Sequence, residues 1–393
     1  MDVRITERPA IGQPGDVERV FVQCLPGLEQ VLTLEATALG RPRHVDGGVE
    51  LEGGPGLHAD AVLGLRTAEA VLLRLLEVGA RRWEEVEAAL RTVVLDAVVE
   101  AGNPVALETS LRMPGAPARG ALPRLLARLC SRPVEQARAE ARDGEATRLV
   151  LRVAEGTASL SADVSGTLLH RRGWRQELSR APMRETLAAG VLALAGYAPQ
   201  RPLWDPVCGS GTLIIEAALV GRSVAPGLGR SFAAEAWPVA ARVDWAGRRQ
   251  RLRALVRPRV PAPILGSDLN AGALGTARRN ARRAGVLGDL RLERLDVARA
   301  TPGPLRPGLV VGNLPYGLRV GAREGLEAFD AAVARALTDP FRAWRRALLV
   351  DDPARLVRAG GRAPDRVHRL VNGGIPVVLG IWETDDGTPV RGV

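Results

Sequence analysis

A short stretch at residues 203–220 constrains the fold more than any other part of the chain. Two apolar residues lead to Asp205, and Gly209 and Gly211 then stand one residue apart before the apolar run 213–220. This order predicts a buried strand, a tight glycine turn and a helix, because glycine has no Cβ and tolerates positive φ. Such a turn lets the backbone approach a nucleotide-like ligand closely.

Strands and helices are predicted to alternate after this turn. Strand-like apolar runs stand at 264–267, 290–295, 309–312 and 347–350, and helical periodicity appears at 271–284 and 326–337. Residues 366–382 are predicted to form a β-hairpin, because Asn372-Gly373-Gly374 carries an Asn-Gly turn signal. The order indicates an α/β fold whose parallel, Rossmann-like sheet ends in an antiparallel hairpin.

The preceding residues predict one or two small α+β units after a loose tail at 1–16. Strands are expected at 20–22, 45–51, 105–110, 149–153 and 158–162. Helices are expected at 28–39, 63–76, 86–99 and 121–129.

Charge is distributed unevenly along the chain. The net charge is +10, and the excess of arginine lies in 167–393, whereas acidic residues outnumber basic ones in 1–166. A basic half favours a polyanionic partner, with nucleic acid ahead of a membrane. Genome composition would explain the arginine richness but not the asymmetry. Within 110–166 the arginines expected to face a polyanion are Arg112, Arg119, Arg124, Arg128 and Arg132. An ordinary solvated helix face is an equally good explanation of them.

Three cysteines, Cys24, Cys130 and Cys208, stand at scattered positions. They provide neither a disulfide framework nor a zinc-ligand spacing, so a reducing compartment and no bound metal are expected. No secretory signal opens the sequence, and the longest apolar runs are too short to cross a bilayer. We therefore expect a soluble, cytoplasmic protein with no membrane partner.

Three acidic residues, Asp205, Asp268 and Asp296, each follow a predicted strand. The C-terminal ends of strands in an open α/β sheet line its ligand crevice. A nicotinamide dinucleotide is disfavoured, because Ile214 holds the third glycine position and the Pro- and Arg-rich insertion 221–262 puts Asp268 far beyond the ~20 residues expected. A ligand with an amine and an adenosine fits better. Asp205 could then meet a cation, Asp268 ribose hydroxyls, and Asp296 the adenine amino group.

The tetrapeptide Asn313-Leu314-Pro315-Tyr316 directly follows the apolar strand 309–312 and is the most specific pattern in the chain. The Asn313 carboxamide oxygen and the Leu314 carbonyl, aligned by the rigid Pro315, would offer two acceptors to an exocyclic amine with two N–H donors. Tyr316 could stack on the base that carries the amine. A turn with a packed tyrosine is the structural alternative.

A predicted linker at 163–186 contains three arginines, Arg171, Arg172 and Arg175, around Gly173 and Trp174. These side chains could grip a phosphate and stack a base. Docking of Trp174 against the following domain explains the same residues at least as well. His170 is expected to be a structural hydrogen-bonding residue, because no catalytic or metal-binding partner stands at a useful spacing.

Residues 205–212 and 313–316 resemble those of the S-adenosylmethionine-dependent amino-methyltransferases. Further stretches are similar to the bacterial THUMP-domain RNA guanine-N2 methyltransferases, which act on large-subunit ribosomal RNA; they are 168–175, 181–189, 225–228, Phe232 and Trp237-Pro238. Residues 25–29, 46–49 and 65–68 resemble the N-terminal region of that family. The resemblance therefore covers nearly the whole chain.

The resemblance implies a ferredoxin-like part at 1–62, a THUMP-like RNA-binding domain at 63–166, a linker at 167–186 and a Rossmann-like class I methyltransferase domain at 187–393. It implies RNA, ribosomal or transfer, as the partner and S-adenosyl-L-methionine as the cofactor. The cofactor-binding residues it implies are Glu185, Asp205, Pro206, Cys208, Gly209, Gly211, Thr212, Asp268, Leu269, Asp296 and Val297. The catalytic residues it implies are Asn313, Leu314, Pro315 and Tyr316.

Three departures from the family pattern bear on the substrate. Leu314 stands where the ribosomal enzymes more often have proline, and the related tRNA guanine-N2 enzymes tend to have leucine. Trp174 replaces a usual tyrosine, and the acidic segment 1–109 shifts the expected phosphate contacts toward 110–152 and the catalytic domain. A tRNA guanine-N2 methyltransferase, an adenine-N6 nucleic-acid methyltransferase and a non-catalytic RNA-binding protein are the alternatives.

Overall fold

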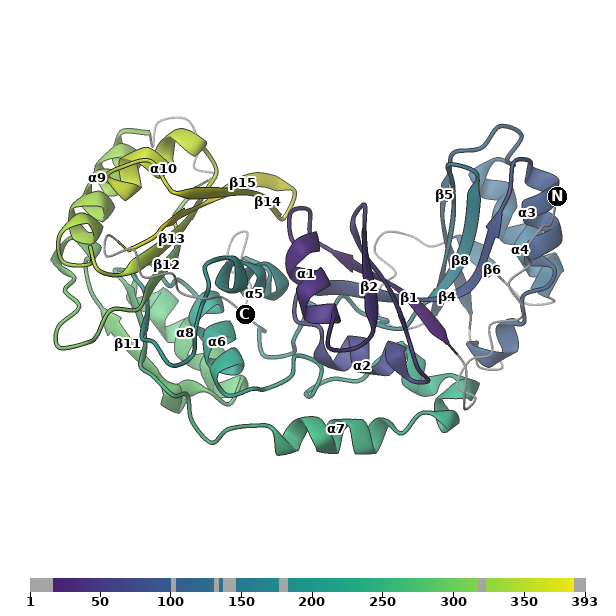
Figure 1. The fold of residues 1–393 in the computed structure, drawn as a ribbon, viewed down its shortest axis with the longest axis horizontal. Helices are drawn as coiled ribbons and strands as arrows, with labels where there is room; N and C mark the ends of the chain where they lie inside the picture. Colours follow the sequence, from purple (N-terminus) through teal and green to yellow (C-terminus); the bar gives the residue numbers. More distant parts are fainter. Residues whose placement is uncertain are drawn as a thin grey trace. The chain divides into compact units, whose positions relative to one another are not determined.

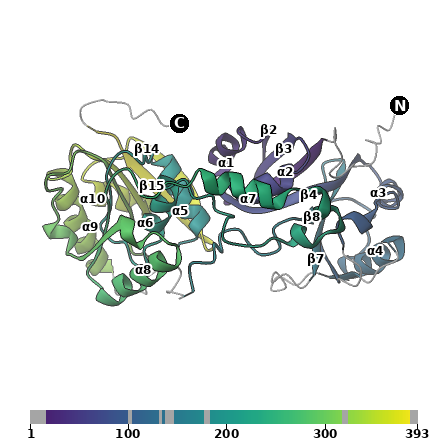
Figure 2. The ribbon, with the colours of Figure 1, turned by 90° about the horizontal axis from the view of Figure 1, so that it is seen from below.

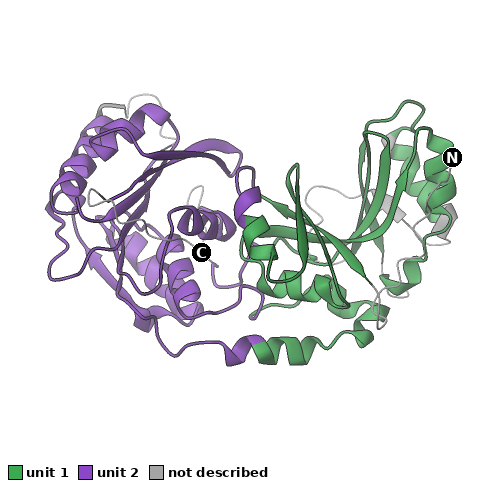
Figure 3. Cartoon of the chain, in the orientation of Figure 1, with its two compact units in different colours: residues 1–24, 32–169, 229–251 green, residues 25–31, 170–228, 252–393 purple. Residues whose placement is uncertain are grey.

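The computed structural model describes residues 17–99, 104–130, 134–136, 146–176, 183–316 and 323–384 of the chain (Figure 1). The chain forms two compact units (Figure 3). Unit 1 comprises 1–24, 32–169 and 229–251, and unit 2 comprises 25–31, 170–228 and 252–393. The predicted boundaries at 62, 166 and 186 stay a prediction, because the two units are not continuous stretches of sequence.

Unit 1 is built on a mainly antiparallel sheet in the order β2-β3-β1-β4-β8-β7-β5-β6. Its strands are β1 Glu18–Cys24, β2 Arg41–Val45, β3 Gly48–Gly53, β4 Ala68–Gly79, β5 Val105–Leu111, β6 Val134–Gln136, β7 Thr147–Ala154 and β8 Thr157–Asp163. The helices of this part of the sequence are α1 Glu29–Ala36, α2 Leu57–Gly64, α3 Trp83–Leu90 and α4 Leu122–Cys130. The expected α+β character is confirmed.

The helix expected over 63–76 is wrong, because most of that stretch is β4. This strand lies between β1 and β8 in the middle of the sheet. Its first six residues are all buried, so apolar side chains occupy both faces and the sequence lacks the alternation typical of a half-exposed strand. The helix expected over 86–99 is also shorter than predicted and ends at Leu90.

Residues 229–251, from the middle of the sequence, complete the core of unit 1. The indole of Trp237 stacks on the buried His58 with ring centroids 6.4 Å apart, and the indole of Trp245 meets the imidazole edge-on at 6.0 Å. The imidazole Nδ1 of His58 lies 2.7 Å from Glu18 Oε2. The helix α7 Trp245–Ala254 begins in this segment. Part of the predicted insertion 221–262 therefore belongs to unit 1.

Unit 2 contains the sheet β11-β10-β9-β12-β13-β15-β14. Its strands are β9 Leu203–Asp205, β10 Ile264–Asp268, β11 Leu290–Arg294, β12 Leu309–Asn313, β13 Arg345–Val350, β14 Arg366–Asn372 and β15 Ile375–Trp382. The first five pair in parallel, and β15 is antiparallel to both β13 and β14. The predicted parallel sheet with a terminal hairpin is confirmed.

Helices cover both faces of the sheet of unit 2 (Figures 1 and 2). The helices are α5 Glu185–Leu194, α6 Thr212–Gly221, α8 Ala271–Arg283, α9 Arg323–Thr338 and α10 Pro353–Gly360. The core beneath α9 and α10 includes the rings of Trp204 and Phe341, stacked with centroids 4.5 Å apart. Burial of large aromatic rings at this density is a main stabilising contribution to such a layer.

The turn of the C-terminal hairpin differs from the sequence expectation by one residue. Asn372 pairs with Ile375 as the last residue of β14, and the two turn residues are Gly373 and Gly374, with φ of 58° and 85°. Because β14 is antiparallel to β15, and β15 to β13, β14 runs in the same direction as β12. Asn372 therefore lies at the edge of the sheet where β12 also ends.

Residues 25–31 are part of unit 2. A Cβ on Gly27, where φ is +90°, would lie 2.2 Å from the Arg369 carbonyl oxygen of β14, and a Cβ on Gly190 of α5 would lie 2.5 Å from Leu28. The glycines at 27 and 190 are therefore required by close packing. Within the described ranges, no helix is long and apolar enough to cross a membrane.

Candidate active site

The glycine turn after β9 is held against the end of β10. Gly209 and Gly211 have φ of 52° and 88°, which confirms the predicted use of glycine there. The backbone N–H of Cys208 donates to the Ser267 carbonyl at 2.9 Å, and that of Gly209 donates to Asp268 Oδ2 at 2.9 Å. A Cβ on Gly209 would meet only the Val207 carbonyl oxygen, at 4.0 Å, so the space beside this backbone is open.

Gly211 supports a prediction about stability. A Cβ there would lie 3.1 Å from the Ala277 Cβ and 3.3 Å from the Ile215 side chain, at a backbone φ of +88°. We expect Gly211→Ala to lower the free energy of unfolding by about 1–3 kcal/mol. Gly285→Ala is the matched control, because Gly285 has φ +73° with no atom near its would-be Cβ. Equal losses for both variants in urea unfolding would contradict the packing part of this prediction.

Asp205 is the most perturbed acid at the glycine turn. Its side chain is buried, with 2% of the residue exposed, and Oδ1 accepts the Val207 N–H at 3.1 Å. Burial, reinforced by the charge of Asp268, raises the pKa of Asp205 to about 8. The carboxyl group is therefore mostly protonated at neutral pH unless a cation lies beside it.

The other acids predicted for the cofactor also hold the backbone at the strand ends. Asp268 Oδ1 accepts the Asn270 N–H at 2.8 Å, and Asp296 accepts the Ala298 N–H at 2.9 Å. Leu269 is 58% exposed directly after β10, whereas Val297 is buried in the core. The structure places Asp268 as the last residue of β10, Leu269 directly after it, and Asp296 and Val297 after the adjacent strand β11. Burial raises the pKa of the Cys208 thiol well above its usual range, so this cysteine is not a thiolate nucleophile.

A buried cluster of charged side chains lies behind the glycine turn. Arg175 Nε lies 3.3 Å from Glu185 Oε1, and Arg175 Nη2 donates to Thr212 Oγ1 at 2.6 Å. Arg172 Nε lies 3.6 Å from Glu216 Oε1. Burial raises the pKa of Glu185 to about 7, and the charge of Arg175 opposes that rise. Glu185 and Thr212 are thus joined through Arg175, which the sequence suggested as a phosphate contact rather than as a partner of these two residues.

The same cluster corrects one sequence expectation. Arg172 and Trp174 are 8% and 5% exposed, so neither is available to grip a phosphate or stack a base in this structure. The alternative, in which Trp174 docks within the protein, agrees with this burial. Arg171 is exposed, as are Arg112 and Arg124. The side chains of Arg119 and Arg128, and all of Arg132, lie outside the described residues, so RNA contact by these arginines stays a prediction.

The tetrapeptide after β12 presents an unusual polar atom. Asn313 Oδ1 is buried and has no hydrogen-bond partner among the described residues. Leu314 is fully buried, and its N–H donates to the Leu349 carbonyl at 3.0 Å. The Tyr316 hydroxyl accepts a hydrogen bond from Asn372 Nδ2. Burial raises the pKa of Tyr316, while hydrogen bonds from Asn372 and Asn313 oppose the rise, so the phenol stays neutral.

Arg355 of α10 positions this tetrapeptide, and the sequence pattern had no signal for it. The side chain is 3% exposed and donates from Nη1 to the Pro315 carbonyl and to Asp351 Oδ1, both at 2.9 Å. Its Nε and Nη2 donate to the two carboxylate oxygens of Asp330 at 3.0 and 2.8 Å. A planar, bidentate arginine pair of this kind fixes direction as well as distance.

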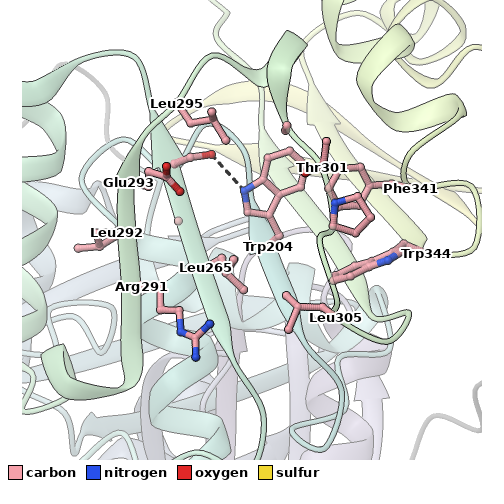
Figure 4. Close-up of a pocket in the computed structure, with 14 residues that line it drawn as sticks. Trp204, Leu265, Arg291, Leu292, Glu293, Leu295, Thr301, Leu305, Phe341 and Trp344 are labelled. Atoms are coloured by element: carbon pink, nitrogen blue, oxygen red, sulfur yellow. Dashed lines mark hydrogen bonds between the residues drawn. The ribbon is translucent and has the colours of Figure 1, made fainter.

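A cavity of about 480 Å³ is lined in part by residues of the strands β9, β10 and β11 (Figure 4). It is lined by apolar and aromatic side chains that include Leu265, Leu305, Phe341 and Trp344, and by Trp204, whose Nε1 donates to Ser267 Oγ at 3.1 Å. None of the predicted site residues lines it. The residue pattern at the strand ends, rather than this cavity, therefore locates the candidate active site. Among the residues that the structure covers, no group of three His, Cys, Asp or Glu residues could hold a metal.

Two protein-family models match this chain, one in its N-terminal region and one in its C-terminal region. A family model described as the RMKL-like methyltransferase domain matches residues 172–380, and a model described as the RlmL ferredoxin-like domain matches residues 19–72. YpsC of Bacillus subtilis, provisionally named an RNA methyltransferase, is 30% identical over 88% of this chain and 91% of its own length.

Two other relatives are longer than the part they share. The provisionally named RNA methyltransferase slr0064 of Synechocystis is 36% identical over 56% of this chain and 57% of its own length. The ribosomal RNA large subunit methyltransferase K/L of Allochromatium vinosum is 40% identical over 55% of this chain, but the match spans only 30% of that enzyme.

Solved structures show the same fold. SMU.472, whose crystal structure was obtained with S-adenosylhomocysteine, superimposes with a TM-score of 0.80 at 24% identity, over 94% of this chain and 98% of its own. The matched range 172–380 includes the glycine turn, Asn313–Tyr316 and all but the last two residues of the C-terminal hairpin. The chain therefore belongs to the RMKL-like methyltransferase family, whose members depend on S-adenosylmethionine.

Proposed function

We propose that this protein is an S-adenosylmethionine-dependent RNA methyltransferase that acts on the N2 amine of a guanine in large-subunit ribosomal RNA. The observation that carries the proposal is the buried Oδ1 of Asn313, which has no hydrogen-bond partner in the described part of the chain and lies at the sheet edge that also holds the glycine turn. A buried acceptor without a partner lowers the stability of the folded protein by about 1–3 kcal/mol. A hydrogen bond from an N–H donor of the substrate would recover this free energy. The relative from Allochromatium vinosum, named for large-subunit ribosomal RNA, supports the choice of RNA.

The residues around the glycine turn fit S-adenosylmethionine. Open space beside the Gly209 backbone admits a ligand, and the raised pKa of Asp205 fits a carboxyl group that ionises when a cation binds beside it. Asp205 would hold the ammonium of the cofactor, Asp268 its ribose hydroxyls and Asp296 its adenine. The bound cofactor supplies a methyl group on a positively charged sulfur.

The catalytic residues would act on the amine. Its lone pair is delocalised into the guanine ring and is a poor nucleophile. Acceptance of its hydrogens by Asn313 Oδ1 and the Leu314 carbonyl draws the nitrogen out of conjugation and stabilises the positive charge that develops on it. Tyr316 would stack on the base and hold the direction of attack. The base must leave its stack to reach this site.

Asp205 leads to a prediction of pH dependence. The pKa of Asp205 is about 8 in the folded protein against a reference value of 3.8, so a cofactor ammonium that requires the carboxylate must displace a proton below pH 8. We expect the affinity for S-adenosylmethionine to rise up to about tenfold per pH unit between pH 6 and 8, then level off. Titration calorimetry in two buffers of different ionisation enthalpy would detect the released proton. An Asp205→Asn variant with the same pH dependence would remove Asp205 from this role.

The same raised pKa affects stability. The folded state binds more protons than the unfolded state between pH 4 and 8, so this carboxyl group lowers the free energy of unfolding as pH rises through that window.

The function is tested by comparing nucleosides from ribosomal and transfer RNA of a deletion strain and its parent by mass spectrometry. Loss of N2-methylguanosine from large-subunit ribosomal RNA, restored by adding the purified protein and cofactor to the isolated RNA, is the expected result. Unchanged N2-methylguanosine in both RNA classes would overturn the proposal.

One specific residue favours a second substrate. Leu314 matches the tRNA guanine-N2 enzymes more closely than the ribosomal ones, so loss of N2-methylguanosine from transfer RNA alone would assign the protein to that class. Loss of N6-methyladenine would assign it to adenine, whose amine the same tetrapeptide can accept. Failure to bind S-adenosylmethionine in calorimetry would favour a non-catalytic RNA-binding protein.

A further inference from the structure

Asn372 at the end of β14 is a second polar residue at the Asn313 edge of the sheet. It is 3% exposed, its Nδ2 donates to the Tyr316 hydroxyl, and its Oδ1 is buried without a hydrogen-bond partner among the described residues. Asn313 and Asn372 thus each have a buried carboxamide oxygen without a partner among the described residues. Both side chains also hydrogen-bond to Tyr316.

The hairpin does not need asparagine at this position. The residues that adopt positive φ in the turn are Gly373 and Gly374, and Asn372 is an ordinary strand residue paired with Ile375. The preference of asparagine for left-handed turn positions therefore does not explain it. A buried amide with one unmet acceptor is unfavourable for folding, which points to a use of that oxygen in ligand binding.

Guanine and adenine differ beside the amine that is methylated. In guanine the ring nitrogen N1 next to the 2-amine carries a hydrogen and is a donor, whereas N1 of adenine, next to the 6-amine, is an acceptor. An acceptor on the protein at that point would bind guanine and oppose an adenine lone pair. A site built to accept a substrate N–H rejects analogues that lack it far more strongly than an apolar pocket does.

We propose that Asn372 determines base specificity, its Oδ1 accepting the N1–H of the target guanine while Asn313 and Leu314 accept the amine. This inference rests on the proposed guanine-N2 function and adds the residue that selects the base. The hydrogen bond from Nδ2 to Tyr316 holds the amide so that its oxygen is directed away from the phenol. Tyr316 would then fix both the stacked base and the residue that reads its edge.

The test uses the shortest transcript that contains the nucleotide methylated by the full-length protein. In a second transcript 2-aminopurine replaces the target guanine, since it keeps the 2-amine but has no hydrogen on N1. We expect the wild-type protein to prefer guanine in kcat/KM by about 10²-fold or more. Asn372→Ala should lower kcat/KM on guanine, leave it unchanged or raise it on 2-aminopurine, whose N1 lone pair no longer faces the carboxamide oxygen, and so reduce the preference to less than about tenfold.

A purely supporting role for Asn372 predicts a different result. If Asn372 only holds Tyr316, both substrates lose activity by the same factor and the preference is retained, which would overturn the inference. A preference that increases in the variant would mean that the amide presents its NH₂ group to the base, and would also overturn it. Val367→Thr, an exposed position on the same strand, is the matched control and should change neither substrate.

The proposed function and this inference fail in distinguishable ways. If the wild-type protein forms no N2-methylguanosine in any RNA, both fall together. If it forms N2-methylguanosine but Asn372→Ala keeps the preference, only the inference falls. Should Asn372→Ala be unfolded by circular dichroism, Asn372→Leu, which has nearly the same shape without polar atoms, gives the same comparison.

Discussion

Replacement of Asn313 by alanine is expected to lower kcat for methyl transfer by about 10²–10³-fold, the usual cost of losing one group that stabilises transition-state charge. The reason is that the buried Oδ1 of Asn313 has no other partner in the described structure, so its proposed use is to accept the substrate amine. The affinity for S-adenosylmethionine should stay within about twofold, because this residue is proposed to act on the amine. Methyl transfer is measured by incorporation of labelled methyl into the RNA.

Asn313→Asp is the informative companion variant. It preserves the shape and an acceptor oxygen, so it should retain more activity than Asn313→Ala, particularly above the pH at which the new carboxyl group ionises. Full activity of Asn313→Ala on the cognate RNA would show that the carboxamide does not take part in the reaction.

Arg355→Met is expected to have the largest effect on stability, about 3–5 kcal/mol, because it leaves the carboxylate of Asp330 buried with much of its charge uncompensated. Asp330 is fully buried, and Arg358, 3.6 Å away and about two-fifths exposed, would compensate only in part. Urea unfolding measures the loss. Arg358→Met is the matched control and should cost less than about 1 kcal/mol.

A double variant separates stability from positioning. Asp330→Leu with Arg355→Met removes both buried charges, so most of the lost stability should return. The Pro315 carbonyl would still lack the donor that it has at 2.9 Å in the structure. We therefore expect the double variant to be folded but low in kcat with an unchanged KM for S-adenosylmethionine. Wild-type kcat in that variant would show that Arg355 has only a structural role.

The catalytic half was predictable because its signals are local. Strand, glycine turn and helix follow one another at 203–221. The carboxyl ends of parallel strands all lie at the same edge of the sheet, so polar residues at these ends can be placed there from the sequence alone. β4 was missed for a physical reason, since a strand buried on both faces has no alternation in sequence. Arg355 and Asn372 were missed because they reach Asn313–Tyr316 from elements 40 or more residues later, and only the tertiary fold brings them there.

The burial of Arg172 and Trp174 shows a limit of composition as a guide. Arginines around a tryptophan are typical of a nucleic-acid-binding surface. Whether these side chains face solvent depends on whether the fold places acidic side chains beside them inside the protein. Here Glu216 and Glu185 supply the opposite charges from inside unit 2. Glu185 lies in the predicted linker itself and Glu216 in a later helix, but spacing alone did not pair them with Arg175 and Arg172.

The interleaved composition of the two units has a consequence for how this protein can be divided. A fragment that begins at residue 187 would lack 25–31, and so would expose the backbone of β14 against which Gly27 packs. A fragment that ends at 166 would lack Trp237 and Trp245 and leave the His58–Glu18 pair without its aromatic cover. No single cut in the sequence therefore yields both units intact. A fragment meant to contain unit 2 must keep residues 25–31, and one meant to contain unit 1 must keep residues 229–251.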